Sequence, residues 1–190
     1  GVDAWEASIL ENVPIPPAVY LRFFQGVDEA RAAYGNPDDE RMMDIMLEDK
    51  TFFAGARFLA KHAAKAGNNA YLYHFSYRPT AARGDGQPGA AHSDEVLFLF
   101  DYLPGSVVTR QALNPEQITA EDRRMGDLLA DYWTNFAKTG NPNGEGLPEW
   151  PQYTEGNDTW MDLGVTPEPL PGFRAKDMDY WEGVYLRALQ

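Results

Sequence analysis

Hydrophobic side chains recur at helical spacing in three long stretches of the chain. Residues 51–66 keep an apolar face and end at Gly67, a residue type that commonly terminates helices. Residues 121–138 form the clearest amphipathic pattern, because Thr119 and Asp122 offer a capping-box start and Gly140 follows as a stop. A third amphipathic helix is predicted over residues 176–188, with its apolar side formed by Met178, Trp181, Tyr185 and Leu186.

Two shorter segments have the composition of strands. Residues 70–77 are rich in aromatic side chains, and residues 159–163 lie between proline-rich connections. Short helices are predicted over residues 18–24 and 28–34, and the three acids at 38–40 suit the start of another helix. Helices and strands therefore mix along the chain, without an internal repeat.

Composition and charge exclude several classes of function. The 190 residues, 44% of them hydrophobic, suffice for one domain with a sizeable core. A net charge of −13 disfavours binding to nucleic acids or anionic membranes, and no apolar run approaches the roughly 20 residues that span a bilayer. Without cysteine, these residues form no disulfide, thiolate metal site or cysteine nucleophile. We predict no cofactor and no metal.

The most informative stretch is residues 89–95 (GAAHSDE), which stands directly before the apolar run at 96–100. Small residues permit a tight turn there, and the ordinary pKa of a histidine, about 6.5, suits a general base at neutral pH. Taken alone, this pattern is more often that of a surface loop histidine. The acids Asp94 and Glu95 are explained by a helix start, where carboxylates stabilise exposed amides.

Four blocks, in order, resemble the type-B carboxylesterases, the family of cholinesterases and bacterial nitrobenzyl esterases. They are residues 1–8 (GVDAWEAS), residues 49–60 (DKTFFAGARFLA), the loop that holds His92, and residues 128–153, which include YWTNFAKTGNPN and WPQY. The resemblance implies that residues 1–190 are the C-terminal part of a single α/β-hydrolase domain. Such a part holds a few sheet strands surrounded by many helices and is completed by an N-terminal portion.

The resemblance also implies a Ser-Glu-His catalytic triad. His92 falls on the family's catalytic histidine and Glu6 on its acid, although Asp3 and Ala7 depart from the usual Asn and Gly of that turn. In this fold the nucleophile precedes the acid and the histidine, and none of Ser8, Ser76, Ser93 and Ser106 lies in a G-x-S-x-G elbow. We therefore expect the serine and the oxyanion hole in an N-terminal portion or a companion chain, which would be a partner of this chain.

The predicted function is hydrolysis of small-molecule carboxylic esters by a serine carboxylesterase. This chain is expected to be part of that enzyme and to be inactive on its own. Two alternatives stay open: a non-catalytic, cholinesterase-like binding or adhesion protein, and an inactive orphan fragment. We expect a soluble protein, and the compartment stays open between secreted, periplasmic and cytoplasmic.

The remaining motifs are given structural interpretations. His62 and His74 lack the spacing of a metal site and are expected to be structural. Residues 84–89 formally satisfy G-x-G-x-x-G but do not open a helix directly after a strand, so we interpret them as a loop. Several aromatic side chains fit either a substrate pocket or core packing: Phe23, Phe24, Phe52, Phe53 and Phe58.

Overall fold

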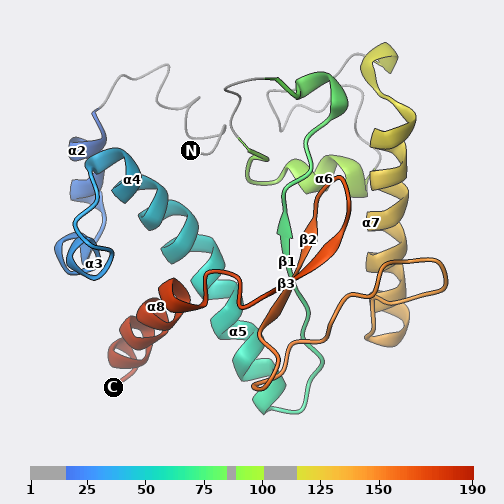
Figure 1. The fold of residues 1–190 in the computed structure, drawn as a ribbon. Helices are drawn as coiled ribbons and strands as arrows, with labels where there is room; N and C mark the ends of the chain where they lie inside the picture. The colour runs from blue at the N-terminus through green and yellow to red at the C-terminus, as the bar shows by residue number, and fades with distance from the viewer. Residues whose placement is uncertain (1–15, 85–88, 101–114) are drawn as a thin grey trace.

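A small mixed sheet organises the part of the chain that the structure, a computed structural model, describes: residues 16–84, 89–100 and 115–190. Its strands lie in the order β1 (Leu72–Phe75), β2 (Thr159–Leu163) and β3 (Glu168–Pro171). β1 and β2 run parallel, whereas β2 and β3 run antiparallel. The sheet lies between α5 (Ala54–Lys65) on one side and α7 (Ala120–Thr139) on the other, with α6 (Asp94–Leu99) beside α7 (Figure 1).

The strand residues alternate between the two sides of this sheet, as pleated strands require. Met161 and Leu163 face α6 and α7 and share a core with Tyr77, Leu97, Phe98, Met125, Leu129, Tyr132 and Trp150. Leu72 and Trp160 face α5 and share a core with Ala60, Ala70 and Tyr153. Both faces of the sheet are therefore covered, which is the layering of an α/β fold.

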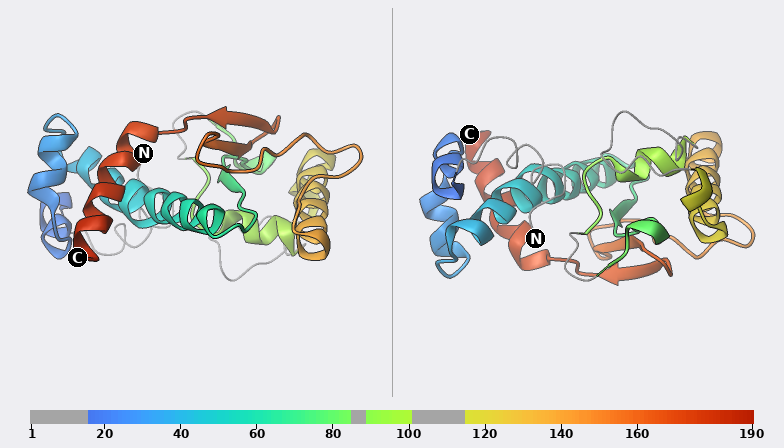
Figure 2. Two further views of the ribbon diagram at one scale, coloured as in Figure 1. Left: turned by 90° about the horizontal axis from the view of Figure 1, so that it is seen from below. Right: turned by 90° about the horizontal axis from the view of Figure 1, so that it is seen from above.

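A third core lies among the N-terminal helices and the last helix. The helices α2 (Pro17–Tyr20) and α3 (Val27–Ala33), joined through a 3₁₀ turn at Leu21–Phe23, pack with α4 (Asp39–Asp44) and α8 (Ala175–Ala188). Both views in Figure 2 place this group at one end of the molecule and α7 at the other. Its buried side chains are Leu21, Ala30, Met42, Met43, Ile45, Met46, Ala54, Met178 and Trp181.

One continuous helical rod joins that end of the molecule to the sheet. It comprises α4, a π-helical segment η2 (Ile45–Phe53) and α5. Asp38 begins the rod by accepting a hydrogen bond from the amide of Arg41 at 2.9 Å. Gly67, at φ +80°, ends it, with the amides of Gly67 and Asn68 bonded to the carbonyls of Ala64 and Ala63 in a Schellman motif.

Most predicted elements are confirmed, with shifted ends. The helix predicted at 121–138 is α7, whose Thr119–Asp122 capping box is present, and the helix predicted at 176–188 is α8. The strand predicted at 159–163 is β2, while the one predicted at 70–77 shortens to β1. The predicted helix at 51–66 is π-helical as far as Phe53, and that at 18–24 divides into α2 and a 3₁₀ turn. β3 was not predicted, because its prolines are rare in strands except at a sheet edge.

Among the described residues, no helix combines the length and the apolar character that crossing a bilayer requires.

Candidate functional site

His92 lies in the turn that leads into α6, two residues before that helix begins at Asp94. Its side chain is exposed, and its ring stacks on the ring of Phe52, with centroids 4.6 Å apart and planes inclined by 28°. Phe52 comes from the π-helical segment η2, forty residues earlier in the chain (92 − 52). The predicted position of His92 before a helix is thus confirmed, and the fold brings it against an aromatic side chain.

The backbone around His92 is held in a tight turn. The side chain of Asp94, 7% exposed, accepts a hydrogen bond from the amide of Ala91 at 2.8 Å, and the amide of Asp94 donates to the carbonyl of Ala91 at 3.1 Å. Between them, Ser93 has a φ of +72°, in the left-handed region that a side chain disfavours. The predicted position of Asp94 at a helix start is confirmed, but its carboxylate binds an amide of the preceding turn. Residues in a disfavoured backbone conformation such as that of Ser93 tend to occur at functional sites.

Glu95 joins this turn to the sheet. Its carboxylate accepts a hydrogen bond from the hydroxyl of Tyr73, on β1, at 3.3 Å. Burial, reinforced by the nearby charge of Glu95, raises the pKa of Tyr73 well above its usual range, so the phenol stays a donor. The turn that carries His92 is therefore held by hydrogen bonds within the turn and by one hydrogen bond to the sheet.

Glu6, the predicted acid, lies outside the described residues, as does its rival Asp3. The pairing of Glu6 with His92 stays a prediction. Residues 85–88, within the formal glycine motif, also lie outside the described residues. The 3₁₀ turn η3 (Thr80–Ala82) stands between β1 and Gly84, so the motif does not directly follow a strand.

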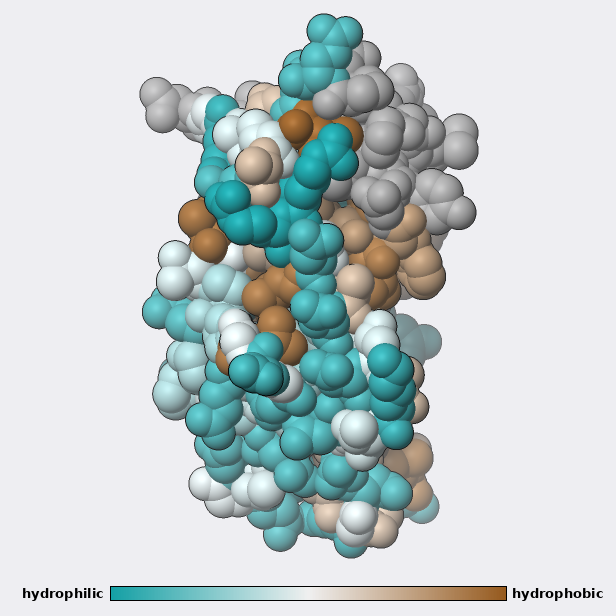
Figure 3. Space-filling view, turned by 90° about the vertical axis from the view of Figure 1, so that its right-hand side faces the viewer, coloured by the Kyte–Doolittle hydropathy of each residue, from teal (hydrophilic) through white to brown (hydrophobic). Residues whose placement is uncertain are grey.

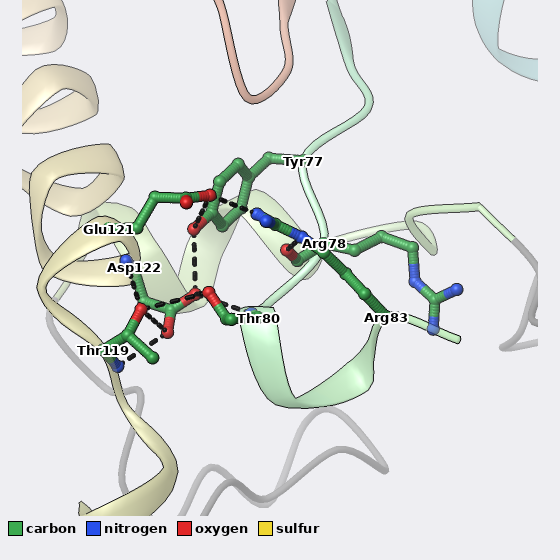
Figure 4. Close-up of polar contacts among 7 residues, drawn as sticks. All are labelled: Tyr77, Arg78, Thr80, Arg83, Thr119, Glu121 and Asp122. Carbon is green, nitrogen blue, oxygen red and sulfur yellow. Dashed lines mark hydrogen bonds and ion pairs between the residues drawn. The ribbon is translucent and has the colours of Figure 1, made fainter.

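A buried carboxylate fixes the segment that leads from β1 toward the His92 turn (Figure 4). Asp122, at the start of α7, accepts hydrogen bonds from the hydroxyl of Tyr77 at 2.8 Å, the amide of Thr80 at 2.9 Å and the amide of Thr119 at 2.8 Å. Burial alone would raise the pKa of Asp122, but the hydrogen bonds from the amides of Thr119 and Thr80 outweigh it and hold the pKa below its usual range. Asp122 therefore remains a carboxylate that clamps this segment to α7.

The structure also pairs a histidine and a carboxylate that the sequence did not link. His74 on β1 lies opposite Asp162 on β2, and its Nδ1 is 3.2 Å from Oδ1 of Asp162. The His74 ring packs beside Phe173 and Phe53, with centroids 4.9 Å and 5.7 Å away. These contacts agree with the structural role predicted for His74, and only strand register reveals its partner.

His62 likewise has local contacts on α5. Its ring packs on Phe58, with centroids 4.1 Å apart, and its Nδ1 lies 2.8 Å from the carbonyl of Phe58. Phe58 also contacts Tyr185 of α8 and so belongs to a helix–helix contact. Within residues 16–84, 89–100 and 115–190, no group of three or more His, Asp or Glu side chains is arranged to hold a metal ion.

Comparison with known proteins agrees with this fold, and the matched family profile spans the last three of the four sequence blocks. The profile of the carboxylesterase family matches residues 23–181. Carboxylesterase 1C of Mus musculus is 31% identical over 168 residues, which cover 87% of this chain and 27% of that protein. The precursor of the medium-chain fatty acyl-CoA hydrolase of Anas platyrhynchos is 33% identical over 139 residues, which cover 71% of this chain and 23% of that protein.

A solved structure, that of PNB esterase, superimposes on this chain with a TM-score of 0.60 and 23% sequence identity. The match covers 80% of this chain and 30% of the esterase, an α/β-hydrolase, and so shows the fold of that part. The chain spans about a quarter of the length of the two relatives named above. By the family profile, the shared blocks and the common fold, the chain belongs to the carboxylesterase family.

Proposed function

We propose that this chain contributes the general base and the acid of a serine carboxylesterase, with His92 as the base and Glu6 as the acid. The observation that carries the proposal is the place of His92. It stands in the segment that resembles the family's histidine loop, in a turn fixed by Asp94, and its ring stacks on Phe52.

The chemistry follows from what an ester requires. A serine hydroxyl attacks the acyl carbon while His92 accepts its proton; the tetrahedral intermediate then collapses, and His92 returns that proton to the departing alkoxide. Glu6 holds the imidazole and stabilises the imidazolium. Water repeats the sequence on the acyl-enzyme, which frees the acid and regenerates the serine.

The serine and the oxyanion hole belong, in this proposal, to a segment outside the 190 residues. The sequence holds no G-x-S-x-G elbow, and the matched relatives are about four times as long as the part that this chain covers. Residues 1–190 are then the C-terminal part of one α/β-hydrolase domain, and the missing portion is the partner that completes it.

The open edge of the sheet supports a missing portion. β1 has a paired neighbour on one edge alone among the described residues, although strands of a buried parallel sheet usually have two. Figure 3, which views the side where α7 lies, shows hydrophobic residues at the surface in separate groups among hydrophilic ones. Large apolar side chains exposed on the described residues include Phe23, Leu59, Phe100, Val165 and Leu189.

The test is labelling of the purified, folded protein with a fluorophosphonate, which reacts with activated serines, followed by intact mass measurement under denaturing conditions. We expect the label to appear on a longer species or on a companion chain. We also expect the substitutions H92A and E6Q to slow labelling by about 10³-fold or more. A label on the 190-residue chain itself would refute the location of the nucleophile. No label on well-folded material that contains the completing portion would favour a non-catalytic binding protein.

The choice of substrate needs its own measurement. One matched relative is named a fatty acyl-CoA hydrolase and the other a carboxylesterase. We propose a carboxylic ester as the substrate of the complete enzyme. Turnover of nitrophenyl acetate and of a medium-chain acyl-CoA should be compared, and a preference for the thioester would contradict this choice.

A further inference from the structure

The π-helical segment η2 directs two consecutive aromatic side chains to different surroundings. The hydroxyl of Thr51 donates to the carbonyl of Met46, five residues earlier, at 2.9 Å, which matches the wider turn of a π-helix. Phe53 points into the protein, where its ring packs edge-on against the rings of Trp160 and Phe173, with centroids 5.8 Å and 5.4 Å away. Phe52 is 38% exposed and stacks on His92.

This segment is anchored by a buried carboxylate. Asp49, within the π-helical turns, is fully buried, accepts a hydrogen bond from the Tyr34 hydroxyl at 3.0 Å and forms an ion pair with Arg174 at 2.7 Å. Arg174 also pairs with Glu48 at 3.1 Å. These contacts tie η2 to the residue that follows α3 and to the residue that precedes α8, so the segment that carries Phe52 is held in place.

We propose that Phe52 is a positioning residue for His92: its ring holds the imidazole in one orientation by packing on its face. The inference rests on the proposed function, because it assigns Phe52 a role only if His92 is the base. It concerns a residue that acts through His92 rather than one that touches the reacting atoms.

Packing on the face of the imidazole suits a catalytic base better than a contact at the edge of the ring would. Both nitrogens of an imidazole lie in the ring plane, so a partner on the face does not use them. The attraction between stacked aromatic rings is enough to favour one side-chain rotamer over its competitors several-fold at an exposed position. The contact thus restricts the ring while its two edges serve the acid and the serine.

The chain contains a matched control in the pair Phe58–His62. These rings are 4.1 Å apart and inclined by 37°, on α5, where His62 lies near a carbonyl of its own helix. The substitution F58L removes the aromatic ring that packs on His62, a histidine to which we assign no catalytic role. F52L makes the same chemical change at His92, and F52W restores an aromatic face.

The experiment has two readouts. NMR of the active, complete enzyme labelled at histidine reports the rotamers of His92 through three-bond couplings and the stack through the ring-proton shifts. Turnover of an ester by the active, complete enzyme reports kcat and KM separately. We expect F52L to move the His92 ring protons downfield, to average its couplings and to lower kcat about 10- to 100-fold with KM changed less than about threefold. F52W should retain the parental values, and F58L should leave both readouts of His92 unchanged.

The outcomes separate this inference from the proposed function. If H92A abolishes turnover but F52L keeps the parental kcat or a single His92 rotamer, the role of Phe52 is refuted and His92 remains the base. If H92A retains turnover, both proposals fail. If F52L raises KM with kcat unchanged, Phe52 binds substrate instead of positioning His92, which also overturns the inference.

Discussion

Asp94 and Ala91 bind each other twice across the residue that carries the proposed base. The Asp94 carboxylate accepts from the Ala91 amide at 2.8 Å, and the Ala91 carbonyl accepts from the Asp94 amide at 3.1 Å. His92 lies between the two, so these bonds fix its backbone and the direction in which its side chain leaves. Because Asp94 is nearly buried, the interaction is shielded from water.

Asp94→Ala should therefore destabilise the fold by about 1–3 kcal/mol, because the amide of Ala91 loses its acceptor. Urea unfolding gives the free energy, and hydrogen exchange at the Ala91 amide should accelerate beyond the change in global stability. Asp127→Ala, at an exposed position on α7, serves as the control and should cost less than about 0.5 kcal/mol. Equal effects of the two substitutions would contradict this account of the turn.

Ser93→Gly should stabilise the protein by about 0.5–1 kcal/mol. Ser93 has a φ of +72°, and a Cβ in the left-handed region costs about 1–2 kcal/mol, of which the greater freedom of glycine in the unfolded chain cancels a part. Ser93→Ala keeps the Cβ and should bring no gain. Thermal unfolding of the three proteins decides the matter, and an alanine variant as stable as the glycine variant would refute the backbone conformation.

Local signals in the sequence were sufficient for several elements. A capping box, a long amphipathic stripe and a terminal glycine together specify α7, and all three depend on residues close in sequence. The turn before α6 was likewise visible in its small residues and its acids. In each case the stabilising contacts lie within a few positions of one another.

Other features depend on contacts between distant parts of the chain. The π-helical turns of η2 were not visible, because the periodicity assumed an α-helix and Asp49 finds Tyr34 and Arg174 only in the folded protein. The stack of Phe52 on His92 joins positions forty residues apart, and the pairing of His74 with Asp162 follows from strand register. No motif in the sequence encodes these three relationships.

Arg57→Ala should cost about 3 kcal/mol, because this side chain, 12% exposed, joins α5 to two other segments. It contacts Asp158 at 2.6 Å and Asp179 of α8 at 2.8 Å. Burial alone would lower the pKa of Arg57, but the hydrogen bonds to Asp158 and Asp179 outweigh it and raise the pKa above its usual range. Arg57→Lys should recover only part of the loss, since an ammonium cannot reproduce the guanidinium fork.

The matched control for Arg57 is Lys65→Ala. Lys65 pairs with Glu155 at 3.3 Å, but the two side chains are 50% and 62% exposed, so the pair should contribute less than about 0.5 kcal/mol. Urea unfolding at low and at high salt gives the loss of stability for both substitutions. Only the loss caused by Lys65→Ala should vanish at high salt. Similar losses from both substitutions would show that Arg57 is no anchor for α8.

Asp49 should make the protein less stable as the pH rises through the mildly acidic range. Burial raises its pKa to about 6 from an ordinary value of 3.8, against the opposing effects of Arg174 and the Tyr34 hydrogen bond. Between these two pH values the folded state keeps a proton that the unfolded state has released, so the free energy of unfolding falls with increasing pH. The full decrease is on the order of 3 kcal/mol, because one pKa unit corresponds to about 1.4 kcal/mol.

Asp49→Asn isolates this contribution, because the amide resembles the protonated acid and does not titrate. Other carboxylates titrate in the same range, so the informative quantity is the difference between variant and parent in urea unfolding at about pH 4 and at about pH 8. We expect the variant to gain on the parent by on the order of 3 kcal/mol between the two conditions. A variant that loses stability relative to the parent at the higher pH would show that the ion pair with Arg174 outweighs the cost of burying the charge.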